Sequence, residues 1–91
     1  MAGGVSLREV EIVNQLGMHA RPAAMFVKLA STFDSEVEIG NATMMVNGKS
    51  IMGVMMLAAE CGSKVTIKAT GPDADRAVEA LAALVARGFD E

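Results

Sequence analysis

The chain has 91 residues, of which 52% are hydrophobic, and its formal net charge at neutral pH is −3. This length suits one hydrophobic core, so we expect a single domain over 1–91, and the acidic balance with only three aromatic residues argues against nucleic-acid binding. No apolar run approaches a membrane span, the start of the chain lacks a signal-peptide pattern, and the single cysteine, Cys61, excludes an internal disulfide, so we expect a cytoplasmic protein with no membrane association.

The first third of the chain predicts a strand, a loop and a helix. Leu7–Val13 alternates in part, with Val10 and Ile12 on one face and Glu9 and Glu11 on the other, which is the period of a strand with one solvated side. Asn14–Gly17 is rich in turn-forming residues and predicts a loop. Ala20–Phe33 has apolar residues at helical spacing, and Pro22 lies near its start, where the missing N–H of proline costs no hydrogen bond.

The middle of the chain predicts a hairpin followed by a short helix. Ser35–Ile39 alternates again, Gly40–Ala42 predicts a turn, and Met44–Val46 predicts a short return strand. Ser50 is a good N-cap for a helix over Ile51–Leu57.

The last third predicts a strand, a helix and a tail. Apolar residues alternate with polar ones over Lys64–Ala69, and Asp73 is expected to cap the final helix. That helix has an apolar stripe of Ala77, Val78, Leu81, Leu84 and Val85. The acidic pair Asp90–Glu91 is expected to be disordered. Half-solvated strands with hairpin pairing predict an α+β two-layer fold, with an antiparallel sheet and helices on one face.

The segment Gly17–Ala24 contains the only histidine of the chain, His19, followed by Arg21 and Pro22. A helix with Pro22 in its first turn places His19 just before the free amides of Ala20 and Arg21. Such amides and the positive end of the helix dipole form an anion site. Because neutral imidazole is a nucleophile at cell pH and arginine matches phosphate geometrically, the segment predicts phosphoryl transfer through His19.

The segment Gly17–Ala24 closely resembles the histidine signature of the HPr family, the phosphocarriers of the bacterial phosphoenolpyruvate-dependent phosphotransferase system. Lys49–Gly53 resembles the second signature of that family, and the resemblance extends roughly from Arg8 to Arg87. It implies a βαββαβα fold whose four-stranded antiparallel sheet has the order 1-4-2-3, with three helices on one face. It also implies a carrier without enzymatic turnover, phosphorylated at His19 on the ring nitrogen nearer the backbone. The chain shows no metal-ligand spacing and no nucleotide-binding fingerprint, so we expect no cofactor or metal.

The resemblance also implies the partners of the protein. Phosphorylated Enzyme I would donate the phosphoryl group and an A-type phosphoacceptor domain would receive it, with the carrier acting as a monomer. The family positions that surround the active histidine correspond to Ala24, Lys28, Ile51, Met52 and Met55. We expect a basic rim that also includes Arg21 and Lys49.

Five methionines occur within thirteen residues, namely Met44, Met45, Met52, Met55 and Met56. Methionine fills irregular cores, and it also suits a surface that must fit several partners. We assign about half of these residues, including Met56, to the core together with Leu57. Cys61 is interpreted as a structural thiol.

Ser50 has two interpretations of equal weight. Serine is a common helix cap that needs no modification. In some HPr proteins, however, the matching serine is phosphorylated by an HPr kinase/phosphorylase, and a phosphate at a helix N-terminus is favoured by the dipole.

Three alternatives to sugar-branch phosphotransfer follow from the sequence. The same fold and histidine serve in the nitrogen-related branch of the system. A ligand-sensing domain would use His19 only as part of an anion pocket. An acylphosphatase-like hydrolase would need a glycine-rich phosphate loop with an arginine, which the chain lacks.

Overall fold

The computed structural model describes residues 4–91, so the first three residues of the stretch considered for a signal peptide lie outside it. Within this range no helix is long and apolar enough to cross a bilayer. The elements in chain order are β1 (Gly4–Glu11), α1 (Ala20–Ala30), β2 (Glu36–Gly40), β3 (Met45–Asn47), α2 (Ile51–Leu57), β4 (Lys64–Gly71), α3 (Ala74–Ala86) and a 3-10 turn (Gly88–Asp90).

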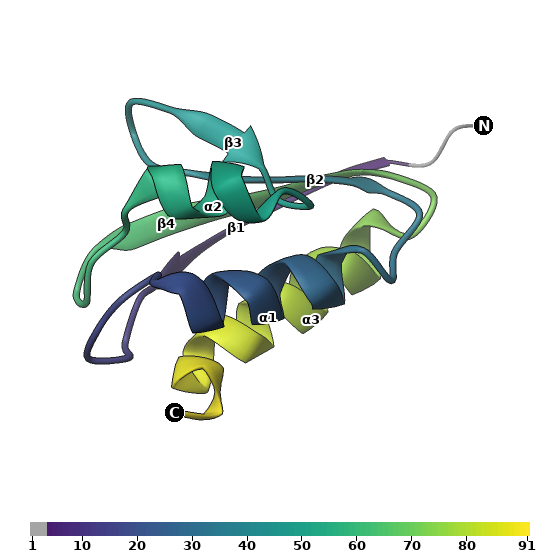
Figure 1. The fold of residues 1–91 in the computed structure, drawn as a ribbon. Coiled ribbons are helices and arrows are strands. Elements are labelled where there is room, and N and C mark those ends of the chain that lie inside the picture. Colours follow the sequence, from purple (N-terminus) through teal and green to yellow (C-terminus); the bar gives the residue numbers. More distant parts are fainter. Residues whose placement is uncertain (1–3) are drawn as a thin grey trace.

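The four strands form one antiparallel sheet in the order β1-β4-β2-β3, as the resemblance implies (Figure 1). β4 lies in the middle, with Val65 opposite Val10 of β1 and Ile67 opposite Ile39 of β2. The three helices cover one face of this sheet. α3 packs against β1 and β4, and α1 packs against α2 and α3. The predicted α+β two-layer fold is confirmed.

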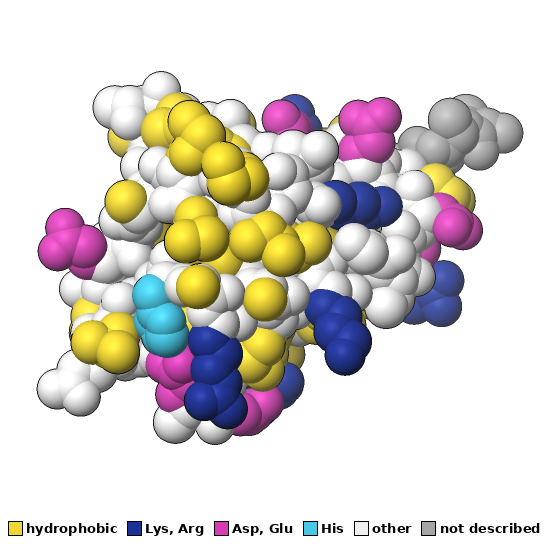
Figure 2. Space-filling model, in the orientation of Figure 1, with side chains coloured by type: hydrophobic (Ala, Val, Ile, Leu, Met, Phe, Trp, Pro, Cys, Tyr) yellow, Lys and Arg dark blue, Asp and Glu magenta, His cyan; other side chains and the backbone are white. Residues whose placement is uncertain are grey.

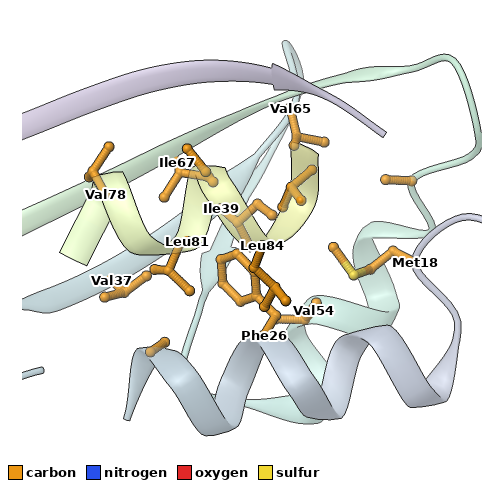
Figure 3. Packing of buried hydrophobic residues seen from close by; sticks show 14 of the residues in the cluster. Met18, Phe26, Val37, Ile39, Val54, Val65, Ile67, Val78, Leu81 and Leu84 are labelled. Carbon is orange, nitrogen blue, oxygen red and sulfur yellow. The ribbon is translucent and has the colours of Figure 1, made fainter. Parts of the chain in front are cut away.

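The core lies between the sheet and the helices. Phe26 of α1 is fully buried and lies among side chains from the sheet and from α3 (Figure 3). The predicted apolar stripe of α3 is confirmed, because all five of its residues are buried. This packing fixes the axis of α1, and hence the position of its N-terminal end.

Several element boundaries differ from the prediction: β1 covers Gly4–Glu11, where Leu7–Val13 was expected, and β2 and β4 end later than expected. At two further boundaries, side chains compete with the backbone. α1 ends at Ala30, three residues earlier than expected, and the hydroxyl of Thr32 donates to the Leu29 carbonyl at 2.7 Å. β3 begins one residue later than expected. The side chain of Asn41 accepts hydrogen bonds from the Thr43 and Met44 amides, which extends the hairpin loop.

The C-terminal tail is ordered, so the prediction of disorder for Asp90–Glu91 is wrong. Gly88, Phe89 and Asp90 have φ values of 65°, 58° and 59°, which reverse the chain after α3. A non-glycine residue in this left-handed region costs about 1–2 kcal/mol. The Phe89 ring is 1% exposed, and its burial contributes about 1.5–3 kcal/mol, enough to offset much of that cost.

Candidate functional site

His19 is the N-cap residue of α1, as predicted. Its backbone is extended, with φ −87° and ψ −171°, and its carbonyl accepts the first helical hydrogen bond from Ala23 at 2.9 Å. The loop before it is tight, because Gly17 has φ +69° and a Cβ there would lie 2.5 Å from the carbonyl oxygen of Ala59. Gly17 is therefore needed to bring the chain past residue 59 and into the helix.

The first turn of α1 offers free amides, as the sequence predicts. Ala20 and Arg21 are its first two residues, so their N–H groups have no carbonyl acceptor within the helix. Pro22 follows them, buried against the core and without an N–H. The His19 side chain makes no capping hydrogen bond, so the ring does not occupy these amides. Arg21 is exposed and forms no ion pair with any residue of 4–91.

Glu91 contacts the candidate histidine, which the sequence did not indicate. Its Oε2 lies 3.1 Å from Nε2 of His19, and the two side chains are 24% and 35% exposed. The residues are 72 positions apart in the chain. The left-handed turn at Gly88–Asp90 is what brings them together, and no short-range pattern announces such a turn.

A cluster of exposed apolar side chains lies beside the histidine (Figure 2). α1 contacts α2, so the two sequence motifs meet at this surface. The five residues of the predicted docking patch are all exposed, namely Ala24, Lys28, Ile51, Met52 and Met55. The structure thus brings together residues that are separated by more than twenty positions in the chain.

The assignment of Met56 to the core is wrong, because its side chain is 67% exposed. All five methionines of the cluster are exposed. The expectation that about half of them fill the core is therefore wrong. The physical reason is that α2 has only seven residues and buries Val54 and Leu57, one turn apart. Leu57 is buried as predicted.

Lys49 differs from the other predicted cations of the rim. Its Nζ donates to the carbonyl of Phe33 at 2.7 Å, and the residue is half-buried. Lys49 therefore links the segment before α2 to the segment that follows α1. Arg21 and Lys28, by contrast, are exposed to solvent.

Ser50 is the N-cap of α2, as predicted, and its Oγ accepts from the amide of Gly53 at 3.1 Å. Asp73 occupies the N-cap position of α3 but makes no side-chain cap, so that prediction is wrong in detail. Its carboxylate instead accepts from the amides of Asp34 and Ser35 and from the Ser35 hydroxyl. These hydrogen bonds lower the pKa of Asp73 from 3.8 to about 2, and the bond from the Ser35 hydroxyl has the largest effect.

Two further side-chain predictions concern Cys61 and metals. Cys61 is exposed, so its thiol adds nothing to the core. In the range 4–91 no group of three or more His, Cys, Asp or Glu side chains is arranged to hold a metal ion.

The fold and the site define a small α+β protein that presents one histidine, beside free helix amides, next to an exposed apolar surface. Residues 7–87 match the family model described as "PTS HPr component phosphorylation site". The chain therefore belongs to the HPr family, the phosphocarrier proteins of the phosphotransferase system. As a family member it acts with protein partners of that system.

Individual relatives agree with this assignment. The phosphocarrier protein HPr of Cupriavidus necator is 49% identical over 92% of this chain and 94% of its own length. The phosphocarrier protein NPr of Shewanella violacea is 42% identical over 92% of both chains. The crystal structure of HPr from Thermoanaerobacter tengcongensis has a TM-score of 0.90 at 42% identity, covering 94% of this chain and 97% of that one. An HPr dimer is also known from that organism, and the monomeric state of this chain stays a prediction.

Proposed function

We propose that His19 accepts a phosphoryl group from phosphorylated Enzyme I and passes it to an A-type phosphoacceptor domain. The observation that carries this proposal is the position of His19 at the N-cap of α1, with its ring outside the helix and the amides of Ala20 and Arg21 free. A nucleophile beside an anion site can both attack phosphorus and retain the product.

The charges at this helix end suit a phosphoryl group in transit. The dipole and the two amides stabilise the dianion, and the exposed Arg21 adds a planar set of donors. A phosphorus–nitrogen bond keeps a high transfer potential, so the group can be handed on. The partner positions the in-line displacement, and the chain serves as a relay without turnover of its own.

The docking patch of Ala24, Lys28, Ile51, Met52 and Met55 is the proposed contact surface for both partners. Relay complexes must dissociate quickly, which favours a small interface. Exposed methionines adapt to surfaces of different shape, so one patch can serve a donor and an acceptor in turn. Arg21 and Lys28 then steer acidic partners to the site.

Ser50 is the proposed site of regulatory phosphorylation by an HPr kinase/phosphorylase. The residue precedes Ile51 and Met52, so it borders the docking patch. A phosphate there adds about −1.5 to −2 units of charge beside the apolar surface and opposes the approach of acidic partners. The regulation would act on docking and leave the chemistry of His19 unchanged.

The test is transfer from radiolabelled phosphoenolpyruvate through Enzyme I. The parent protein should gain an acid-labile, base-stable label, and His19→Ala should gain none. Ser50→Ala is the matched control and should label like the parent. An unlabelled parent, or a labelled His19→Ala, would refute the proposal. Enzyme I from the sugar and nitrogen-related branches, assayed side by side, identifies the branch by the faster transfer.

A ligand-sensing domain predicts a different outcome. It would bind a small anion saturably and carry no acid-labile label, and hydrolysis of acyl phosphates would be expected only of an acylphosphatase-like protein. Measuring label, ligand binding and hydrolysis on one preparation separates the three.

A further inference from the structure

The carboxylate of Glu91 is held between two side chains of the histidine loop. Oε2 lies 3.1 Å from Nε2 of His19, and Oε1 accepts from Nδ2 of Asn14 at 3.3 Å. Each carboxylate oxygen thus has its own partner. The contact with His19 is therefore part of a chain of three residues and does not depend on a single mobile pair.

Asn14 fixes this arrangement from inside the protein. Its side chain is 6% exposed, and Nδ2 also donates to the carbonyl of Gly17 at 2.7 Å. Both neighbours, the Gly17 carbonyl and the Glu91 carboxylate, are acceptors, so the amide must present its nitrogen to them. It does so although its Oδ1 has no hydrogen-bond partner within residues 4–91. The orientation of Asn14 is thus set by the loop and the tail.

The C-terminal tail is anchored next to these three hydrogen-bonded side chains. Phe89 is buried in the core, and the turn after α3 lies close to Asn14, which a Cβ on Gly88 would approach to 3.7 Å. A fixed anchor two residues before Glu91 restricts where its carboxylate can lie. Figure 1 shows the C-terminal end of the described chain below the start of α1.

We propose that Glu91 is a positioning residue for phosphoryl transfer, an inference that rests on His19 being the phosphoacceptor. A carboxylate accepts and cannot donate, so Nε2 of His19 must carry the proton that faces it. In the neutral ring the lone pair then lies on Nδ1. Glu91 thereby selects Nδ1 as the nucleophile and closes the Nε2 edge to phosphorus.

The proposed step balances without any further reactant. The Nδ1 lone pair forms the new bond to phosphorus, the bond between phosphorus and the donor group breaks, and the donor retains that electron pair. The ring of His19 becomes positively charged, and the Nε2–H proton is shared with Oε2 of Glu91. The carboxylate stabilises this cation in the way that the aspartate of a Ser-His-Asp triad stabilises its imidazolium. Onward transfer reverses these changes.

The experiment compares Glu91→Gln with Asp90→Asn. Asp90 is the matched control, because it is the adjacent acid of the same tail and pairs with Arg87 at 3.1 Å, away from His19. Nitrogen-15 NMR of the histidine ring at alkaline pH reports the tautomer. The parent and Asp90→Asn should show mainly the Nε2–H form, whereas Glu91→Gln should lose that preference. Transfer from Enzyme I should slow about tenfold in Glu91→Gln only, less than for a buried proton acceptor because water can replace an exposed one.

Phosphoramidate, a donor that needs no protein partner, tests the choice of nitrogen directly. Phosphorus-31 NMR should find only Nδ1-phosphohistidine in the parent and a mixture with the Nε2 isomer in Glu91→Ala. Equal tautomers, rates and isomers in the parent and the Glu91 variants would overturn the inference, as would an equal loss in Asp90→Asn. If Enzyme I fails to label the parent while the isomer still depends on Glu91, the relay proposal fails and the positioning role is supported.

Discussion

The two helices that begin beside the proposed docking patch start in opposite ways. At α2, Ser50 caps its own helix by accepting from Gly53, the third helical residue. At α1, His19 makes no cap, and the third helical residue is Pro22, which has no N–H to donate. The same position therefore supplies the capping donor in one helix and removes it from the other.

Because of this difference, we expect the start of α2 to contribute mainly to stability and the start of α1 mainly to chemistry. A side chain that caps its helix is held in place and contributes about 1 kcal/mol to folding. A side chain that does not cap leaves the amides of Ala20 and Arg21 for an outside anion and remains free to react. In α1, the helix start is held without a cap, by the burial of Pro22 and by the contact of Glu91 with His19.

The largest effect is expected from His19→Ser, which places the cap residue of α2 at the start of α1. We expect phosphoryl transfer to fall to zero in the Enzyme I assay. Stability should change by less than about 0.5 kcal/mol, because Pro22 cannot donate to the new hydroxyl. Urea unfolding measures the second quantity. A gain as large as a full cap would show that the Arg21 amide can replace the missing donor.

Arg21→Ala tests whether the free end of α1 needs a charge as well as amides. The rate of transfer should fall about 10- to 100-fold, since one donor to the transferred group is lost. The unfolding midpoint should stay near that of the parent, because the side chain is exposed and forms no ion pair within residues 4–91. Arg21→Lys is the control, and it should recover part of the rate because it restores charge without the planar fork.

Ser50→Ala removes the cap of α2 and should behave in the opposite way to the changes in α1. We expect a loss of about 1 kcal/mol in the free energy of unfolding, measured in urea, with transfer through His19 unchanged. Ser50→Asp retains a capping oxygen and should recover the stability. A slower rate in Ser50→Asp at low salt only would support the proposed effect of charge on docking.

The smallest effect concerns Asp73 at the start of α3, where the side chain holds a neighbouring segment. Its pKa is about 2 in the folded protein and near 3.8 when unfolded, so the unfolded state binds more protons between these values. This contribution is complete above pH 4 and is lost as the pH falls towards 2. Unfolding midpoints should therefore drop more steeply over this range in the parent than in Asp73→Asn. Parallel curves would contradict the assignment.

The sequence was informative for most features that a local pattern decides, although the local hydrogen bonds of the Thr32 and Asn41 side chains moved two element boundaries. Proline in a first turn located His19 at the helix start, and alternation located β4 and its neighbours. Ser50 was predicted as a cap because capping depends on residues within one turn. These features depend on short-range sterics and hydrogen bonds, which neighbouring residues determine.

Other errors arose where distant contacts, or the side of a helix that is buried, decide the structure. The sequence predicts disorder at Glu91, because neither its contact with His19 nor the burial of Phe89 has a local signal. Asp73 was expected to cap its helix, but the amides of Asp34 and Ser35 compete for its carboxylate from 38 or 39 residues away. The assignment of Met56 to the core is wrong because composition alone does not fix which side of a seven-residue helix is buried.

The exposed methionines have a consequence for how the protein ages in solution. Peroxide reaches the thioethers of Met52 and Met56 directly, whereas Met18 is 4% exposed and shielded by the core. Conversion to sulfoxide makes these flexible apolar groups polar without disturbing the interior. Oxidised preparations would then remain folded but bind their partners more weakly. A methionine sulfoxide reductase would restore the binding.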